Sequence, residues 1–185
     1  MAGCALTAGI SLPCKDYVGG VRKVYLGHLS DFDSGVTVAS NVVTVLPTAT
    51  IYEFEVKPQT ASWIEAPTGD SAAHTVSFVQ TLEFQVPALA KTLGVATELI
   101  AMEAIVRGRW VAFVEDSNGN RLMMGRLDGA EANAGEWTTG VAKIDFNGYK
   151  LTLTADERFP AEHVAADTAT PFDNVGGTIT IPPNP

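Results

Sequence analysis

The sequence predicts a mainly β protein: an antiparallel β-sandwich or barrel with one flanking α-helix, extended arms and a long loop. Three observations support this prediction. Segments of alternating apolar and polar residues recur along the chain, turn sequences such as Asn-Gly separate several of them, and one stretch has the apolar spacing of a helix. The 185 residues suit a single domain, 1–185, with a substantial core.

Composition narrows the classes of function. A net charge of −9 argues against a surface that binds nucleic-acid phosphates. No stretch approaches 18 uninterrupted apolar residues, which argues against a transmembrane span. Only 18% of the residues are charged, against about a quarter in an average soluble domain. We therefore expect part of the surface to be covered by other chains.

Residues 1–20 are predicted to form an N-terminal arm, because they contain four glycines and show little periodicity. They lack the basic and apolar regions of a secretory signal. The two cysteines of the chain, Cys4 and Cys14, both lie in this arm. Whether they form a disulfide stays open, because a protein made in the cytoplasm does not ordinarily keep one.

Strands are predicted through the first half of the chain. Segment 21–29 alternates, with Val21 and Tyr25 on one side. Segment 36–50 is rich in valine and threonine and carries no charge, so it is either a strand or a long loop or hairpin that pairs with something else. The other predicted strands are 50–57, 61–66 and 74–86, with a loop at 67–73.

One helix is predicted after the long strand. Pro87 suits the first position of a helix, Gly94 weakens the segment, and Gly108 ends it. The apolar stripe of this helix consists of Leu89, Leu93, Ala96, Leu99, Ile100 and Val106.

Two hairpins and a second arm are predicted in the second half. An Asn-Gly pair supplies the positive φ angles of a tight turn, and such a pair occurs twice. The first hairpin joins 109–115 to 121–127, a polar loop covers 128–136, and the second hairpin joins 137–146 to 149–155 across Asn147-Gly148. The C-terminal arm, 167–185, contains one strand candidate at 177–181.

No motif for catalysis, cofactor binding or metal binding is recognised, and the three histidines lack ligand spacing. Glu53, Glu55 and Glu83 are the only candidates for an acid–base pair, and alternating glutamates more commonly form the wet side of a sheet. Trp63, Trp110 and Trp137 suggest either sugar stacking or core and interface positions. The chain is therefore not expected to be an enzyme or to need a cofactor.

The uncharged loop and the two arms indicate assembly, because extended segments gain stability by pairing with the sheet edge of a neighbour. We expect contacts between copies through the 36–50 segment and the N-terminal region. The candidate contact residues are Val36, Val38, Val42, Val43, Val45, Val21 and Tyr25.

The sequence resembles the tail tube (major tail) proteins of long-tailed bacteriophages. The resemblance rests on Cys4 and Cys14 near the start, and on the order and residue pattern of four segments: 19–26, 83–102, 111–125 and 140–149. It implies a β-sandwich or barrel core with one flanking helix, an architecture that the tube protein of type VI secretion shares. It also implies six copies in a ring, whose inner sheets join into one barrel, and rings stacked into a hollow tube.

The resemblance further implies a virion location, synthesis in the cytoplasm of the host bacterium, and no membrane partner. The implied partners are other copies of the chain, the tape measure, the tail terminator and the baseplate or tip, while genomic DNA passes through the lumen. Six copies at −9 carry −54 per ring, and a negative lumen lets DNA slide without adhering. The residues expected to face the lumen, rather than the outside, are Glu53, Glu55, Glu83 and Gln85.

Two other classes of function stay open. A head-decoration or tail-terminator protein has a similar build, and a β-sandwich that binds carbohydrate would use exposed aromatic residues on one concave face.

Overall fold

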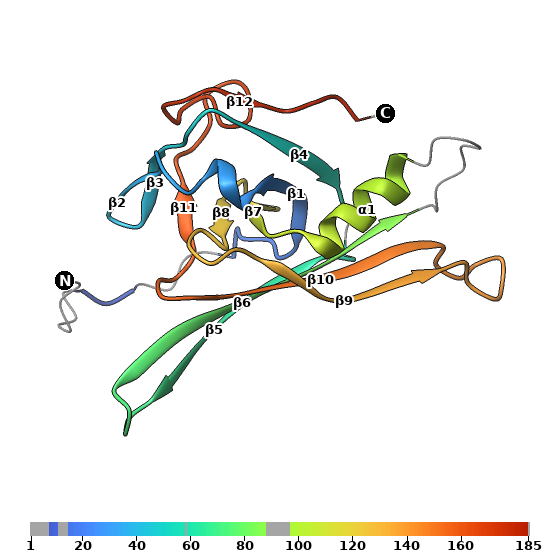
Figure 1. Ribbon diagram of the computed structural model, residues 1–185, viewed down its shortest axis with the longest axis horizontal. Helices are drawn as coiled ribbons and strands as arrows, with labels where there is room; N and C mark the ends of the chain where they lie inside the picture. The colour runs from blue at the N-terminus through green and yellow to red at the C-terminus, as the bar shows by residue number, and fades with distance from the viewer. Residues whose placement is uncertain (1–7, 11–14, 58, 88–96, 185) are drawn as a thin grey trace.

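The computed structural model describes residues 8–10, 15–57, 59–87 and 97–184. Cys4 and Cys14 lie outside these residues. Two β-sheets pack face to face, and one α-helix flanks them within the described part of the chain (Figure 1). This confirms the predicted sandwich with a single flanking helix.

The larger sheet has eight strands in the order β12-β4-β1-β7-β8-β11-β3-β2, and the smaller sheet has four in the order β5-β6-β10-β9. The elements are β1 (Val21–His28), a 3-10 turn (Leu29–Asp31), β2 (Thr37–Ala39), β3 (Val42–Val45), β4 (Ala49–Glu55), β5 (Ser62–Asp70), β6 (Thr75–Pro87), α1 (Thr97–Arg107), β7 (Trp110–Asp116), β8 (Arg121–Met124), β9 (Glu131–Thr138), β10 (Gly148–Glu157), β11 (Glu162–Val164) and β12 (Ile179–Thr180).

A first core lies between the two sheets. Period-two alternation sends one set of side chains from each sheet into this layer, and α1 closes its side with Met102 and Ile105. The sheets contribute, among others, Val24, Leu26, Ala112 and Val114 from the larger sheet and Leu82, Phe84, Leu151 and Leu153 from the smaller one.

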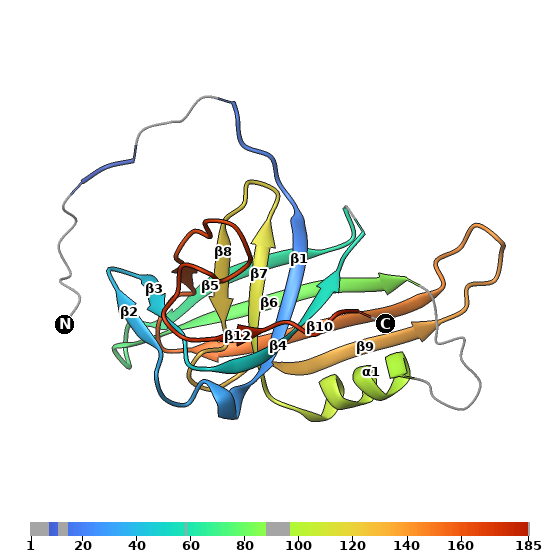
Figure 2. The same ribbon diagram turned by 90° about the horizontal axis from the view of Figure 1, so that it is seen from above.

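A second core lies on the opposite face of the eight-stranded sheet. Its central residues are Tyr25, Ile51 and Phe113, each completely buried. The C-terminal segment covers them, with Phe172 and Val175 buried among them. Figures 1 and 2 show this segment, in red, passing over the sheet on the side away from β6 and β10.

The C-terminal arm therefore packs on its own chain instead of extending from it. Strand β12 pairs in parallel with β4, and Leu46 donates its N–H to the carbonyl of Gly176 at 2.9 Å. Gly177 has a φ of +118°, and a Cβ there would clash with the Leu46 carbonyl oxygen, so this close approach requires glycine.

Segment 36–50 forms a hairpin followed by the start of β4, which settles the alternative that the sequence left open. Ser40 and Asn41 make its two-residue turn with φ angles of 52° and 62°, as a tight hairpin requires. Strand β3 then pairs in parallel with β11 of the same chain. The hairpin is thus an intramolecular part of the larger sheet.

The predicted helix start was wrong. Pro87 is the last residue of β6, and the described helix begins at Thr97. Pro87 lies opposite Gly148 in β10, so strand pairing decides its conformation. The stripe residues Leu89, Leu93 and Ala96 lie outside the described residues, as does Gly94.

The loop predicted at 67–73 was also wrong, because β5 continues to Asp70. Pro67 is tolerated there since β5 is an edge strand, where one side of the backbone needs no partner. The turn comes later, at residues 71–74. Asp70 begins it by accepting the N–H of Ala72 at 2.8 Å.

The second predicted hairpin exists with a different connection. Residues 131–136 form a strand instead of a loop, the strand predicted to begin at residue 137 already ends at Thr138, and residues 139–147 form a loop instead of a strand and tight turn. The carboxylate of Asp145 accepts the N–H groups of Val141 and Ala142 at 2.9 and 2.7 Å. This local turn competes with strand pairing and overrides the Asn-Gly signal.

Candidate functional site

The outward face of the four-stranded sheet is the broadest regular surface that the described fold leaves uncovered. Its residues alternate with those that enter the first core, and most are serine, threonine, valine or alanine. Among the described residues of this face Lys150 is the one basic residue, and it pairs with Glu136 at 3.2 Å. By strand register the acidic residues of the face are Asp70, Glu83, Glu131, Glu136 and Asp156. The face is therefore polar and acidic.

Both edges of this sheet lack a second strand partner within the described chain, and α1 packs beside β9. Strands β5 and β9 are the outer strands, and each has a partner on one side only. Strand β9 contains no proline or lysine, the residues that commonly block an edge. A bulge at Asn133 is its one irregularity, and in β5 Pro67 follows five unblocked residues. Unpaired backbone groups therefore line both edges.

The four residues expected to line a lumen lie on two different surfaces. Glu83 and Gln85 point outward from the four-stranded sheet. Glu53 and Glu55 lie on the second-core side of the eight-stranded sheet, where Glu53 forms an ion pair with Lys23 at 2.7 Å. Because the two sheets stack, these pairs face opposite sides of the molecule. They cannot line one common surface, and they cannot form an acid–base pair with one another.

Three of the residues expected at contacts between copies are buried in their own chain. Tyr25 and Val43 are completely buried in the second core, and Val21 is buried in the first. Without exposed surface they cannot contact a neighbour in this conformation, and the expectation is corrected for them. The valine-rich segment packs inward because β3 is paired on both sides. Of the remaining candidates, Val36, Val38 and Val42 are half-buried and Val45 is exposed.

The described part of the N-terminal arm leaves the fold at the turn between β7 and β8. Val18 and Asn118 exchange two hydrogen bonds, of 2.9 and 2.8 Å, and Ser117 donates to the Gly20 carbonyl at 3.1 Å. Residues 15–20 are exposed on both sides of these contacts. The Asn-Gly turn that the sequence predicted thus also anchors the arm.

The three tryptophans do not form a platform for a sugar. Trp110 is buried and donates its indole N–H to the Ile105 carbonyl at 2.9 Å, and Trp63 packs against the first core. Trp137 alone is more than half exposed, and it contacts Tyr149 edge to face. The core interpretation holds for two of the three.

Two large apolar side chains are fully exposed at the tip of the β9–β10 loop. Val141 and Ile144 are 103% and 95% exposed, although Asp145 fixes the backbone between them. The N–H groups of Ala142 and Val141 hold the pKa of the Asp145 carboxyl below its usual range. The loop therefore presents a defined apolar tip.

Sequence reasoning missed two clusters of buried polar groups. In the first, Glu157 accepts the N–H groups of Leu127 and Asp128, both at 3.0 Å, and ties β10 to the loop after β8. Burial raises the pKa of Glu157. Gln80 lies nearby and accepts the N–H of Gly125 at 3.1 Å. A polar residue on the apolar face of the 74–86 segment was the signal for this cluster.

The second cluster surrounds Arg121, which is 7% exposed. Its two terminal nitrogens bind Glu115 and Asp167, each at 2.6 Å, and its guanidinium lies 4.4 Å from the ring centre of Phe172. The sequence around an arginine next to an Asn-Gly turn predicts an exposed side chain. Arg121 is buried because the distant segment 167–172 packs over it.

The described residues contain no group of three or more histidine, cysteine, aspartate or glutamate side chains placed to hold a metal ion. None of the described helices has the length and apolar character needed to cross a membrane. Comparisons with protein-family models, with curated proteins and with solved structures find no match.

Proposed function

We propose that the chain is a structural subunit of a bacteriophage tail tube, in which the four-stranded sheets of neighbouring copies join edge to edge. The observation that carries the proposal is that, within the described residues, β5 and β9 each have a strand partner on one side only and the outer face of their sheet is uncovered. The outer strands of such a sheet carry backbone N–H and C=O groups without partners, and these groups can pair with a strand of another copy.

The direction of the strands suits such a joint. Each neighbouring pair in the sheet is antiparallel, so β5 and β9, at opposite ends of four strands, run in opposite directions. When β5 of one copy lies beside β9 of the next in the same orientation, the joint is again antiparallel. This contact joins two different surfaces, and such head-to-tail contacts generate rings or helical filaments.

The bare face then forms the inner wall of the tube. With the six copies that the resemblance implies, four strands from each give about 24 strands, more than in the 16–18-stranded porins that enclose an aqueous channel. Glu83 and Gln85 would line this wall, and Glu53 and Glu55 would not. A wall rich in small polar residues with few positive charges gives DNA phosphates little to bind.

The proposed location is the virion tail, and the proposed partners are those of a tube. Other copies of the chain would supply the lateral contacts, and the tape measure, the tail terminator and the baseplate or tip would be the other protein partners.

The edge contact is tested by placing lysines on β5. Ile64→Lys together with Ala66→Lys puts two charges on exposed positions of the proposed joint. We expect the wild-type chain to form rings or tubes in electron microscopy and sedimentation, and the double variant to remain monomeric, because charged edge residues oppose strand pairing.

The matched control is Val76→Lys, an exposed valine on β6 of the same hairpin that is not on the edge strand. It should assemble like the wild type, and all three proteins should have the same far-UV circular dichroism. Rings formed equally well by the double variant would refute the edge contact. A wild-type chain that stays monomeric up to its solubility limit would count against spontaneous assembly.

A further inference from the structure

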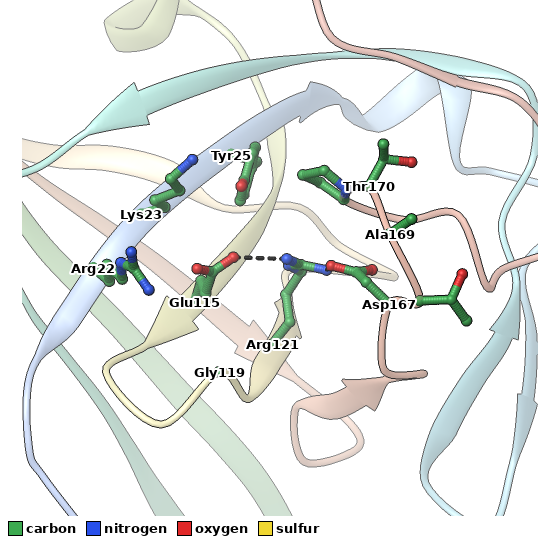
Figure 3. Close-up of a pocket in the computed structure, with 11 residues that line it drawn as sticks. Arg22, Lys23, Tyr25, Glu115, Gly119, Arg121, Asp167, Ala169 and Thr170 are labelled. Carbon is green, nitrogen blue, oxygen red and sulfur yellow. Dashed lines mark hydrogen bonds and ion pairs between the residues drawn. The ribbon is translucent and has the colours of Figure 1, made fainter.

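A polar cavity of about 310 Å³ opens beside Arg121, between β1, the β7–β8 turn and the C-terminal segment (Figure 3). It lies on the second-core side of the eight-stranded sheet, away from the face and edges used above. Figure 3 shows side chains from all three elements pointing into the same space. Its lining includes Arg22, Lys23, Tyr25, Glu115, Arg121 and Asp167.

Arg121 is fixed in this cavity, and one of its three guanidinium nitrogens has no partner among the described residues. Its terminal nitrogens are held by Glu115 and Asp167, and its plane is stacked over the Phe172 ring. The remaining Nε–H is buried and has no hydrogen-bond partner among the described residues. The two ion pairs and the ring contact hold the guanidinium plane, so the direction of the Nε–H is fixed.

Tyr25 presents a second donor of the same kind. The residue is completely buried, its ring is held edge to face against Phe172 at 5.3 Å, and its hydroxyl has no partner in the described chain. Burial keeps the pKa of this hydroxyl well above its ordinary value, so it stays protonated. Buried donors are costly unless an acceptor meets them.

A β-bulge turns a third donor toward the cavity. The pairing of β1 with β7 shifts register between Val21 and Lys23, so the side chains of Arg22 and Lys23 both line the space instead of alternating. Lys23 is paired with Glu53, whereas Arg22 has no ion-pair partner among the described residues. Bulges commonly re-aim a side chain next to a binding site.

We propose that this cavity binds a small oxyanion, either a phosphate or a carboxylate, through Tyr25 Oη, Arg121 Nε and Arg22. The unsatisfied groups are two buried donors and one unpaired cation, and oxyanions supply several acceptor lone pairs with a negative charge. Glu115 and Asp167 are paired with Arg121, and Glu53 with Lys23, which offsets their charge. In addition to burial, these three carboxylates still help to raise the pKa of Tyr25, so the anion needs the positive charges of Arg22 and Arg121 to bind beside them. The site does not rest on the proposed tube function.

Thermal unfolding of the full chain tests the site, with sodium phosphate and sodium acetate as separate probes and sodium chloride at equal ionic strength as the reference. At about ten times its dissociation constant, a bound anion should raise the Tm by about 3–6 °C. Two variants should lose this rise: Tyr25→Phe, which removes the buried hydroxyl alone, and Arg22→Gln, which changes an exposed residue that the fold does not need.

The matched control is Arg158→Gln, an exposed arginine outside the cavity lining. It should keep the rise. A rise with both probes indicates a general oxyanion site, and a rise with one probe alone identifies phosphate or carboxylate as the ligand. An equal rise in all four proteins, or none beyond that in chloride, would overturn the proposal and leave ordered water as the partner of the two donors.

The Nε–H signal of Arg121 gives a second readout. In a ¹H–¹⁵N spectrum it should move on addition of the effective anion in the wild type and stay in place in Arg22→Gln. A signal that never moves would also overturn the proposal. A chain that binds the anion but forms no tubes would keep this site and lose the proposed function, so the two failures are distinguishable.

Discussion

The two sheets of this protein are covered unequally. The eight-stranded sheet is buried on both faces, by the smaller sheet on one side and by the C-terminal segment on the other. The described residues cover the four-stranded sheet on one face only. Sequence reflects the difference: β7 opens with five consecutive buried residues, whereas β10 alternates buried and half-buried positions. One sheet has both faces packed inside the chain, and the other leaves one face uncovered by the described residues.

The largest effect is expected from a substitution in the C-terminal segment that covers the larger sheet. Phe172→Ala removes a buried ring that contacts both Tyr25 and Phe113. We expect the free energy of unfolding, measured by urea denaturation, to fall by about 3–5 kcal/mol.

Phe159→Ala is the control, because Phe159 is 47% exposed. It should change the free energy of unfolding by about 0.5 kcal/mol or less. Equal losses in the two variants would mean that the C-terminal segment is not part of a core.

Lowering the pH should destabilise one of the two regions before the other, with a smaller effect than that of Phe172→Ala. Asp173 accepts N–H groups from Thr168, Ala169 and Thr170 and the Thr168 hydroxyl, and these bonds hold its pKa far below the ordinary value of 3.8. A lowered pKa stabilises the fold above pH 3.8, and this contribution is lost as the pH falls toward the folded-state pKa. Acidification should therefore loosen the C-terminal cover.

Glu157, which ties the two sheets together, should respond in the opposite sense. Burial raises its pKa, so its contribution to stability is complete below its ordinary value of 4.5 and is lost as the pH rises through the folded-state pKa. Hydrogen exchange below about pH 3.8 should accelerate at residues 168–170 before residues 127–128. Asp173→Asn should remove the pH dependence at 168–170, and simultaneous opening of both segments would contradict the distinction.

The smallest expected effect is at the tip of the β9–β10 loop. Ile144→Ser replaces a side chain that is 95% exposed, so the free energy of unfolding of the isolated chain should change by less than about 0.5 kcal/mol. Ile105→Ser, in the first core, is the buried counterpart and should be strongly destabilising. A large loss for Ile144→Ser would show that the tip already has a partner within the chain.

The sequence predicted local structure well where the signal was local. Alternation located β1, β4 and β6, and the Asn-Gly pair located the turn between β7 and β8. The same pair misled at residues 147–148, because the carboxylate of Asp145 captures nearby N–H groups and forms a turn of its own. The Asn-Gly dipeptide alone does not reveal that a nearby carboxylate competes with strand pairing for the backbone N–H groups.

What the sequence did not reveal was which side of the molecule each surface occupies. Glu53 and Glu83 both lie on polar strand faces, and alternation identifies a face without saying which sheet or layer it belongs to. The second core was missed for the same reason. Its cover comes from Phe172 and Val175, whose segment has no regular period and pairs with strands more than a hundred residues earlier.

Those long-range pairings have a kinetic consequence. His163 pairs with Val42 and Ile179 with Ala49, so the outer layer closes loops that span most of the chain. Contacts so distant in sequence form slowly, on the millisecond-to-second scale typical of β topologies. Refolding should therefore pass through an interval in which the hairpins are formed and the Tyr25 face is bare. During that interval the apolar surface most prone to misassociation is the one that the finished protein hides completely.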